Sequence, residues 1–330
     1  MAQVTVFGAG AMGTALAMHA ARAGVPTSLW ANPLDERALA GMRTERRHPT
    51  LPEHLPDSLQ VFGPEELEPA AEGCEVAVLG ASSAGARSLA AMVAGVISPA
   101  GSVVSLAKGL EPDSLLRVSE VYAEVLGREE VIAVGGPCLA GELAEDQPSA
   151  AVWAADRLGA ARTAGDRLVN ESYQVMYSDD LPGVEYAAVV KNVAAIGMGI
   201  LDGLAGRREQ DLRNAKAALF TLAVHELATL VTALGGRRET ALGLAGLGDA
   251  LVTSLGGRNR RYGEVVGTGA DPKAALERME AEGHTVEGVD STRALRALAD
   301  RAGVDLPYHL AVEGVLFGGN DPATLLEVLP

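Results

Sequence analysis

The chain has 330 residues, of which 48% are hydrophobic and only 4% aromatic, and its formal net charge is −16. This length fits about two domains, and so acidic a chain lacks the basic surface that general nucleic-acid binding requires. Its two cysteines, Cys74 and Cys138, cannot form a disulfide framework, so we expect a reducing, cytoplasmic setting. We expect neither a secretory signal nor a membrane span, because no basic-then-apolar N-terminal segment and no long charge-free apolar run occurs.

The first half of the chain alternates short apolar runs with helical patterns. Residues 3–7 predict a buried strand, a helix follows as far as Gly24, and residues 27–31 predict a second strand. Because this alternation is typical of a parallel, doubly wound sheet, we expect an α/β fold here. Further strands are expected at residues 59–63, 75–81, 101–107, 130–136, 149–155 and 174–178.

The pattern changes at the break Pro182-Gly183. Beyond it the strand signal almost disappears, and long segments with apolar residues at helical spacing take its place. We therefore predict an α/β domain over residues 1–182 and an all-α domain over residues 183–330. Helices are expected at residues 184–204, 212–234, 239–255, 272–282, 289–302 and 307–317.

A glycine-rich turn, Gly8-x-Gly10-x-x-Gly13, lies between the first strand and the first helix. This is the setting that the dinucleotide-binding fingerprint of Rossmann-type domains demands. The glycines allow a tight turn, close approach of the backbone to a pyrophosphate, and close packing of helix on strand. The N-terminus of the helix then presents free N–H groups to the phosphates.

The end of the second strand bears on the choice between NAD and NADP. An acidic residue there would hold the ribose 2′-hydroxyl of NAD, but the segment Trp30-Ala31-Asn32-Pro33 contains none. Arginines follow it, one of which could meet a 2′-phosphate, although an arginine in such a position more often lies on a solvated helix face. The sequence therefore leaves NAD and NADP as alternatives. These arginines are Arg37, Arg43, Arg46 and Arg47.

Two lysines stand out from their surroundings. Lys191, next to Asn192, lies in the otherwise apolar segment 187–199. Either its chain snorkels to water, or it faces a closed site in which burial and a nearby cation lower its pKa and let it exchange a proton. Lys108 follows a predicted strand, at the edge where open α/β sheets bind ligands, although a lysine in such a turn is often merely solvated.

The segment 246–263 is a second polar island. Asp249 follows an apolar run between glycines, and residues 256–261, GGRNRR, are basic in an otherwise acidic protein. Arginine recognises phosphate with bidentate geometry. The island therefore indicates either a phosphate site or an exposed basic face. No metal-binding spacing of histidines and no nucleophile elbow appears.

Six segments, taken in order along nearly the whole chain, point to one family. They are GAGAMGTALA, SLAKGLE, VVKNVAAIGMGILDGL, NAKAAL, GLAGLGD and GGRNRRYG. Together they resemble NAD(P)-dependent sn-glycerol-3-phosphate dehydrogenase. The most specific pieces are KNVAAIG, NAKAAL and GRNRR, because many dehydrogenases share the glycine fingerprint.

The resemblance implies reversible hydride transfer between NAD(P)H and C2 of dihydroxyacetone phosphate, giving sn-glycerol 3-phosphate. It implies that Lys191 is the acid/base, that Asp249 orients and charge-balances it, and that Lys108 approaches the substrate from the first domain. The implied substrate contacts are Asn192, Thr253, Arg258 and Asn259, and the implied cofactor contacts are Gly8, Gly10, Ala11, Met12, Gly13, Asn32, Lys108, Arg258 and Glu287.

The same resemblance implies NAD or NADP as cofactor and a small phosphorylated substrate. It also implies a cytoplasmic homodimer with a place in glycerophospholipid synthesis. The net charge and the hydropathy pattern separately lead us to expect no nucleic-acid partner and no stable membrane insertion.

The chain departs from the family pattern in three places. Asn32 stands where the family usually has an arginine, which puts the cofactor preference in doubt. The segment 135–144, GGPCLAGELA, and the charged loop 206–213 also differ. Because we expect that loop near the substrate, a related dehydrogenase acting on another polyol or ketose phosphate is the main alternative.

Two more distant alternatives remain, of which the first shares the two-domain plan. One is a β-hydroxyacid or ketopantoate-type reductase, against which the GRNRR island argues for a phosphate. The other is a cofactor-binding regulator without catalysis, against which the joint presence of Lys108, Lys191, Asp249 and Arg258 argues.

Overall fold

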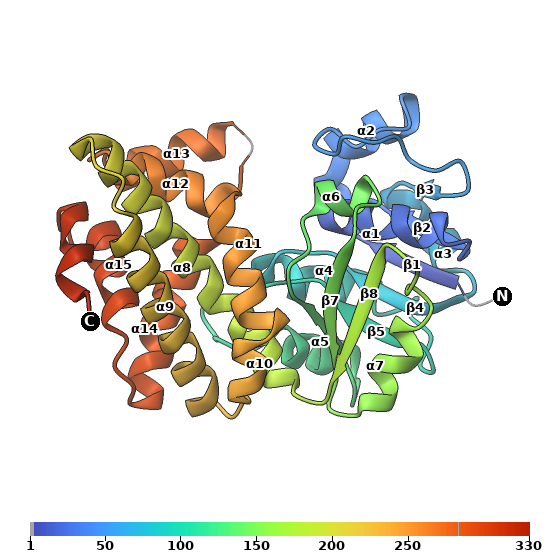
Figure 1. Cartoon of the computed structure of the whole chain (residues 1–330). Coiled ribbons are helices and arrows are strands. Elements are labelled where there is room, and N and C mark those ends of the chain that lie inside the picture. The colour runs from blue at the N-terminus through green and yellow to red at the C-terminus, as the bar shows by residue number, and fades with distance from the viewer. Residues whose placement is uncertain (1–2, 283) are drawn as a thin grey trace. The chain divides into compact units, whose positions relative to one another are not determined.

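The computed structural model describes residues 3–282 and 284–330. It divides into two compact units, Met1–Leu181 and Pro182–Pro330. Figure 1 colours the chain from blue at the N-terminus to red at the C-terminus, so that the sheet-containing unit runs from blue to green.

An eight-stranded sheet forms the centre of the first unit. Its order in space is 3-2-1-4-5-6-7-8. All neighbouring strands are parallel except the sixth and seventh, which are antiparallel, so the expectation of a wholly parallel sheet is wrong at this pair. The strands are β1 (Gln3–Phe7), β2 (Thr27–Trp30), β3 (Gln60–Phe62), β4 (Cys74–Leu79), β5 (Ser102–Ser105), β6 (Ile132–Gly135), β7 (Ser149–Ala154) and β8 (Tyr173–Ser178).

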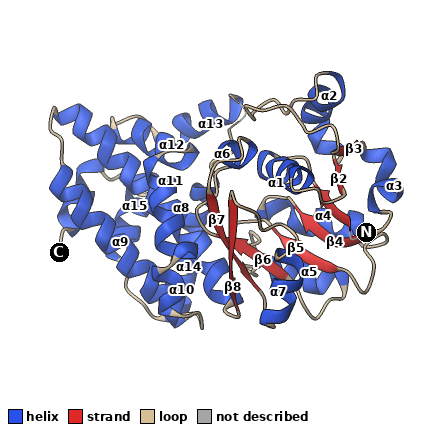
Figure 2. Cartoon of the chain, turned by 45° about the vertical axis from the view of Figure 1, so that its right-hand side comes forward, coloured by secondary structure: helices blue, strands red, loops and turns tan. Residues whose placement is uncertain are grey.

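Helices cover both faces of this sheet, as the predicted doubly wound fold requires (Figure 2). Successive side chains of a strand point to opposite faces, and along β1 Val6 joins one buried core while Phe7 joins the other. The helices of this unit are α1 (Ala11–Arg22), α2 (Glu36–Thr44), α3 (Leu67–Ala71), α4 (Ala86–Val93), α5 (Val118–Leu126), α6 (Ala140–Ala144) and α7 (Leu158–Gly165), with short 3-10 turns η1 (Pro33–Asp35), η2 (Pro64–Glu66) and η3 (Ser83–Gly85).

The strand order reverses between β1 and β4. The chain runs outward from β1 through β2 to β3 and then crosses back to β4 on the other side of β1. In open α/β sheets, ligands bind outside the carboxyl ends of the strands at such a switch point. Gly8 directly follows β1 and Gly80 directly follows β4, so the glycine fingerprint lies at this point of the fold.

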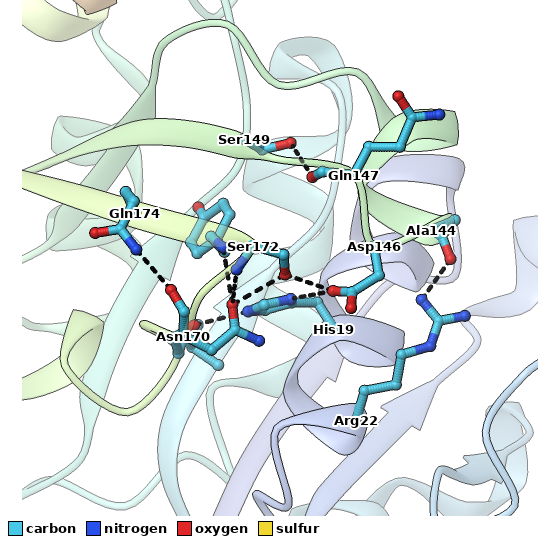
Figure 3. Close-up of polar contacts among 11 residues, drawn as sticks. His19, Arg22, Ala144, Asp146, Gln147, Ser149, Asn170, Ser172 and Gln174 are labelled. Atoms are coloured by element: carbon cyan, nitrogen blue, oxygen red, sulfur yellow. Dashed lines mark hydrogen bonds and ion pairs between the residues drawn. The ribbon is translucent and has the colours of Figure 1, made fainter.

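Buried polar contacts fix α1, the helix that follows the fingerprint. His19 is fully buried on α1, and its Nε2 donates a hydrogen bond to the carbonyl oxygen of Leu168 at 2.7 Å. Figure 3 shows the imidazole beside Asp146 and Ser172, which lie just before β7 and just before β8. Burial lowers the pKa of His19 despite the neighbouring Asp146, so the ring is neutral at neutral pH. The first unit thus holds α1 in place without a buried charge.

Among its described residues the second unit contains helices joined by turns and loops and has no strand, as expected from the sequence (Figure 2). The helix expected over residues 239–255 is instead two α-helices joined by a π-helical turn, and the basic island forms a helix that the apolar periodicity does not reveal. The elements are α8 (Leu181–Arg208), α9 (Arg213–Ala233), α10 (Arg238–Leu242), the π-turn η4 (Leu244–Gly248), α11 (Asp249–Leu255), α12 (Arg258–Gly267), α13 (Pro272–Ala281), α14 (Glu287–Ala302), α15 (Pro307–Phe317) and the 3-10 segment η5 (Pro322–Val328).

Two helices, α8 and α9, are long and apolar enough to cross a membrane by length and composition. A helix in the core of a globular protein has the same composition. The most apolar window of α8 is 89% buried within the structure, against 44% for α9. Burial in the core therefore accounts for the apolar character of α8.

The helices α8 and α12 touch through their backbones. A Cβ atom added to Gly199 on α8 would lie 2.0 Å from the carbonyl oxygen of Arg260, and one added to Gly263 on α12 would lie 2.1 Å from that of Ile196. No side chain fits such a contact. The glycines therefore bring the start of α12, which carries the basic island, against the middle of α8.

Candidate active site

The glycine fingerprint forms a cradle that suits a dinucleotide pyrophosphate. Gly8 has a φ of +105°, and a Cβ there would lie 2.8 Å from the carbonyl oxygen of Gly80, while a Cβ on Gly13 would lie 2.6 Å from that of Gly8. Gly10 is the N-cap of α1 and supplies no capping side chain, so the first turn, with Ala11 and Met12, keeps its N–H groups for a ligand. The geometry therefore fits the predicted NAD or NADP.

The end of β2 differs from expectation, because an acidic group does reach it. The turn η1 folds Asp35 back, and its Oδ2 accepts hydrogen bonds from the backbone N–H groups of Ala9 at 2.8 Å and Asn32 at 3.1 Å. The Asn32 side chain is used locally, accepting from the N–H of Leu34 at 2.7 Å. The prediction that no acid serves this strand end is wrong. The sequence carries a signal for it, since Asn-Pro-x-Asp matches a capping box with proline at the first helical position.

Lys108 lies in the loop after β5 and is half-buried. Its Nζ donates a hydrogen bond to the carbonyl oxygen of Gly136 at 3.0 Å. Met12 of the fingerprint and Cys138 of the divergent segment line the same small cavity as Lys108. Within the first unit, Lys108 is therefore held close to the N-terminal turn of α1.

The second unit pairs Lys191 with Asp249. Lys191 lies in α8 and is 6% exposed, and its Nζ is 2.7 Å from Oδ1 of Asp249, which is 1% exposed. Thr253, one turn along α11, accepts a hydrogen bond from the same Nζ at 3.3 Å. The ammonium is buried but charge-paired, so the snorkelling alternative is wrong, and the pairing expected from the family resemblance is present.

The π-turn η4 sets the position of Asp249, the first residue of α11. A Cβ on Gly246 would lie 1.9 Å from the carbonyl oxygen of Ala241, so the chain passes very close to α10 here. Single π-turns within helices are frequent at functional sites. The wider π-helical turn formed by residues 244–248 places the carboxylate of Asp249 next to Lys191 of α8.

An amide pair links α8 to α12. Asn259 is buried; its Nδ2 donates to Oδ1 of Asn192 at 2.9 Å, and its Oδ1 accepts from the N–H of Gly288 at 3.0 Å. The Nδ2 of Asn192 is buried and has no hydrogen-bond partner among the described residues. A buried donor of this kind is costly unless a ligand satisfies it. Asn192 therefore has a free donor next to Lys191 in the chain.

Arg258 and Glu287 stand at helix starts. Arg258 is exposed at the first position of α12 and has no ion-pair partner among the described residues. Glu287 is half-buried at the first position of α14. Of the predicted site residues in the second unit, the fold groups Lys191 with Asp249 and Thr253, and Asn192 with Asn259. Arg258 is the neighbour of Asn259 on α12.

Part of the basic island is structural. Asp202 on α8 accepts hydrogen bonds from the Arg260 guanidinium at 2.8 and 2.9 Å and from Lys216 at 2.7 Å. These two cations belong to the segments GRNRR and NAKAAL, so an ion triad in the helical unit accounts for one cation of each segment. Arg260 is therefore committed to Asp202, whereas Arg258 is not.

The charged loop 206–213 does not lie where the sequence analysis expected it. It lies at the C-terminal end of the continuous helix α8, more than ~20 Å along the axis from Lys191 at 1.5 Å per residue. Two of its arginines form ion pairs, Arg207 with Asp321 and Arg213 with Asp211, each at 2.8 Å. The expectation that this loop lies beside the substrate is wrong, and it no longer argues for another substrate.

Comparison with known proteins decides the family. A family model described as the N-terminus of NAD-dependent glycerol-3-phosphate dehydrogenase matches residues 3–161, and the corresponding C-terminus model matches residues 180–327. The chain belongs to this family. The NAD(P)+ glycerol-3-phosphate dehydrogenase 2 of Salinibacter ruber is 38% identical, over 99% of this chain and 93% of the relative. The enzyme of Geobacillus kaustophilus is 36% identical, over 100% of this chain and 94% of the relative.

A solved structure agrees with this assignment. The crystal structure of glycerol-3-phosphate dehydrogenase from Coxiella burnetii superposes with a TM-score of 0.88 at 32% identity, covering 99% of this chain and 98% of that chain. The predicted family, the α/β-then-helical fold and the class of NAD(P)-dependent oxidoreductase acting on a CH–OH group are thereby confirmed.

Proposed function

We propose that this chain catalyses reversible hydride transfer between NADH or NADPH and C2 of dihydroxyacetone phosphate, giving sn-glycerol 3-phosphate. The observation that carries the proposal is the buried pair of Lys191 on α8 and Asp249 on α11. Beside Lys191 in the chain, Asn192 has a buried Nδ2 without a hydrogen-bond partner among the described residues. A substrate oxygen would satisfy this donor. The names of the relatives support the same substrate.

Lys191, paired with Asp249, supplies the proton that ketone reduction needs from the protein. The nicotinamide, when bound, supplies a hydride to C2. Lys191 donates a proton from Nζ to the C2 oxygen and is left as a neutral amine that regains a proton from solvent; in the reverse direction it accepts that proton. Asp249 holds Nζ in place and balances its charge. We assign to Lys108 a second positive charge that stabilises the developing negative charge on oxygen.

We assign the substrate phosphate to the start of α12. This helix begins at Arg258 after Gly257, has no side-chain cap, and so presents free N–H groups beside a guanidinium. Both features favour a phosphate dianion. Asn259, buried and bonded to Asn192, ties this helix start to the lysine-bearing helix. Binding energy from the phosphate would then orient C2 for reaction.

A substrate comparison tests the proposal. The loss of reduced-nicotinamide absorbance is followed with dihydroxyacetone phosphate, with unphosphorylated dihydroxyacetone and with longer ketose phosphates. We expect rapid turnover of dihydroxyacetone phosphate and a kcat/KM at least about 100-fold lower without the phosphate. Protein that binds cofactor but does not turn over dihydroxyacetone phosphate would refute the substrate assignment.

The family resemblance also supports a homodimer in the cytoplasm whose product enters glycerophospholipid synthesis. Light scattering should then give twice the 33.9 kDa mass of the chain. A mass equal to one chain would refute the dimer.

A further inference from the structure

Two residues of the segment that follows β2 form hydrogen bonds with the backbone of the glycine-fingerprint loop, one to an N–H group and one to a carbonyl oxygen. The N–H of Ala9 donates to Oδ2 of Asp35 at 2.8 Å, and its carbonyl oxygen accepts from Nε2 of His48 at 3.1 Å. Ala9 is fully buried, and His48 is 5% exposed. Asp35 therefore lies against the loop that would cradle the dinucleotide, at the carboxyl end of β2.

In Rossmann-type domains this strand end faces the adenosine ribose of the cofactor, and the acid that binds the 2′-hydroxyl comes about 20 residues after the glycine fingerprint. Asp35 fits both conditions. A carboxylate offers about four acceptor sites, and the two N–H groups use Oδ2 alone. Oδ1 has no partner among the described residues. It is therefore available to accept a hydrogen bond from a ribose hydroxyl.

The backbone donors at this strand end are also occupied. Free N–H groups of a loop bind a phosphate well, but here the N–H groups of Ala9 and Asn32 already point at the Asp35 carboxylate. A 2′-phosphate would have to displace a negative charge from these donors and then lie beside it.

Most of the arginines that could compensate are engaged elsewhere. Arg43 pairs with Glu66. Arg46 donates to the carbonyl oxygens of Pro56 and Leu59, and Arg47 donates to that of Pro52 at 3.0 Å, so both hold the loop between α2 and β3. His48 adds no charge, because burial lowers its pKa. Arg37 is exposed and has no partner among the described residues.

We propose that Asp35 makes this chain selective for NAD(H) over NADP(H). The proposal rests on the dinucleotide binding assigned above and settles which of the two cofactors is used. Asp35 accepts a hydrogen bond from the ribose 2′-hydroxyl through Oδ1 and repels a 2′-phosphate. Of the four arginines that could offset this repulsion, Arg43, Arg46 and Arg47 are engaged elsewhere, which leaves only the exposed Arg37.

The selectivity assigned to Asp35 is tested by measuring cofactor binding instead of enzyme turnover. Dissociation constants of NADH and NADPH are measured by nicotinamide fluorescence, without substrate, for the wild-type chain, for Asp35→Asn and for the control Glu36→Gln. Glu36 is exposed beside Asp35, so its variant removes the same charge without touching the loop. We expect the wild type to bind NADH at least about tenfold more tightly than NADPH. Asp35→Asn should cut this ratio about tenfold, whereas Glu36→Gln should change it less than about twofold.

The wild-type titration tests the preference for NADH over NADPH even if the Asp35→Asn variant is poorly folded. Equal affinity for the two cofactors, or tighter NADPH binding that Arg37→Ala abolishes, would overturn the selectivity while leaving dinucleotide binding intact. An unchanged ratio in folded Asp35→Asn would overturn the role of Asp35. Failure to bind either cofactor would instead overturn the proposed function itself.

Discussion

In the first unit the chain presents backbone N–H groups from a glycine turn, held by Asp35 and a neutral His48. In the second it presents one charged side chain, Lys191, buried against Asp249. Substitution by any residue except proline leaves a backbone N–H in place, so the first site is most simply disrupted by adding side-chain atoms. The second depends on side chains and is broken by removing them.

The largest effect is expected at Lys191. Lys191→Met keeps the volume but removes the proton donor, so kcat should fall by about 10³-fold or more. Affinity for NADH should not change, because the fingerprint belongs to the other unit. Steady-state kinetics and fluorescence titration measure the two quantities. Lys273→Met, at an exposed lysine of α13, is the matched control, and a kcat near the wild-type value would remove the acid/base assignment.

In the first unit, adding a side-chain atom to the glycine fingerprint should weaken cofactor binding. In Gly8→Ala the new Cβ meets the carbonyl oxygen of Gly80, and a φ of +105° is strained for alanine. We expect NADH affinity to fall by about 10- to 100-fold, while kcat at saturating cofactor changes less. Gly95→Ala, where nothing lies within 4 Å of the added atom, controls for the substitution. Normal affinity in Gly8→Ala would mean that the cofactor does not use this turn.

A smaller effect is expected at the helix start that we assign to phosphate. Arg258→Ala should raise the KM for dihydroxyacetone phosphate by about 10- to 100-fold, with a lesser change in kcat, because a charge-assisted bidentate contact is lost. Arg261→Ala removes an exposed arginine from the same helix and should leave KM unchanged. Equal effects of the two substitutions would show that general surface charge, not a defined contact, attracts the substrate.

The same contrast explains how far the sequence could predict the structure. The fingerprint and the strand and helix around it are local, so their order along the chain followed from spacing alone. Their place at the switch point is set by the strand order, which only the structure shows. The direction of β7 did not follow from spacing either, because the segment 136–148 is long enough for a parallel crossover but contains only a five-residue helix before the chain turns back. Asp35 was predictable in principle from its capping box, and was missed because the acid was expected on the strand itself.

In the second unit the pairing of Lys191 with Asp249 came from family resemblance, since no periodicity reveals a contact between residues so far apart. The helix α12 escaped prediction for a physical reason. It packs on α8 through Gly263 and Gly267, so backbone atoms fill the places where apolar side chains would mark a buried face.

The smallest expected effect is on the pH dependence of stability, and it concerns the first unit. Burial lowers the pKa of both His19 and His48, and both lie in the first unit. Below the ordinary histidine pKa of about 6.5 the unfolded chain therefore binds protons that the folded unit does not, so stability falls as the pH drops. The two tryptophans, Trp30 and Trp153, also lie in this unit. Their fluorescence should report a lower unfolding midpoint at pH 5 than at pH 7.

Substitution of His48 measures how much this histidine contributes to the fall in stability at low pH. His48→Gln keeps a donor for the Ala9 carbonyl but does not titrate, so the fall in midpoint between pH 7 and pH 5 should be smaller than in the wild type. His54→Gln changes an exposed histidine of the neighbouring loop and should leave the fall unchanged. If both variants kept the full wild-type fall, His48 would contribute nothing. The acid sensitivity of the cofactor-binding unit would then come from His19 on α1 or from carboxylates.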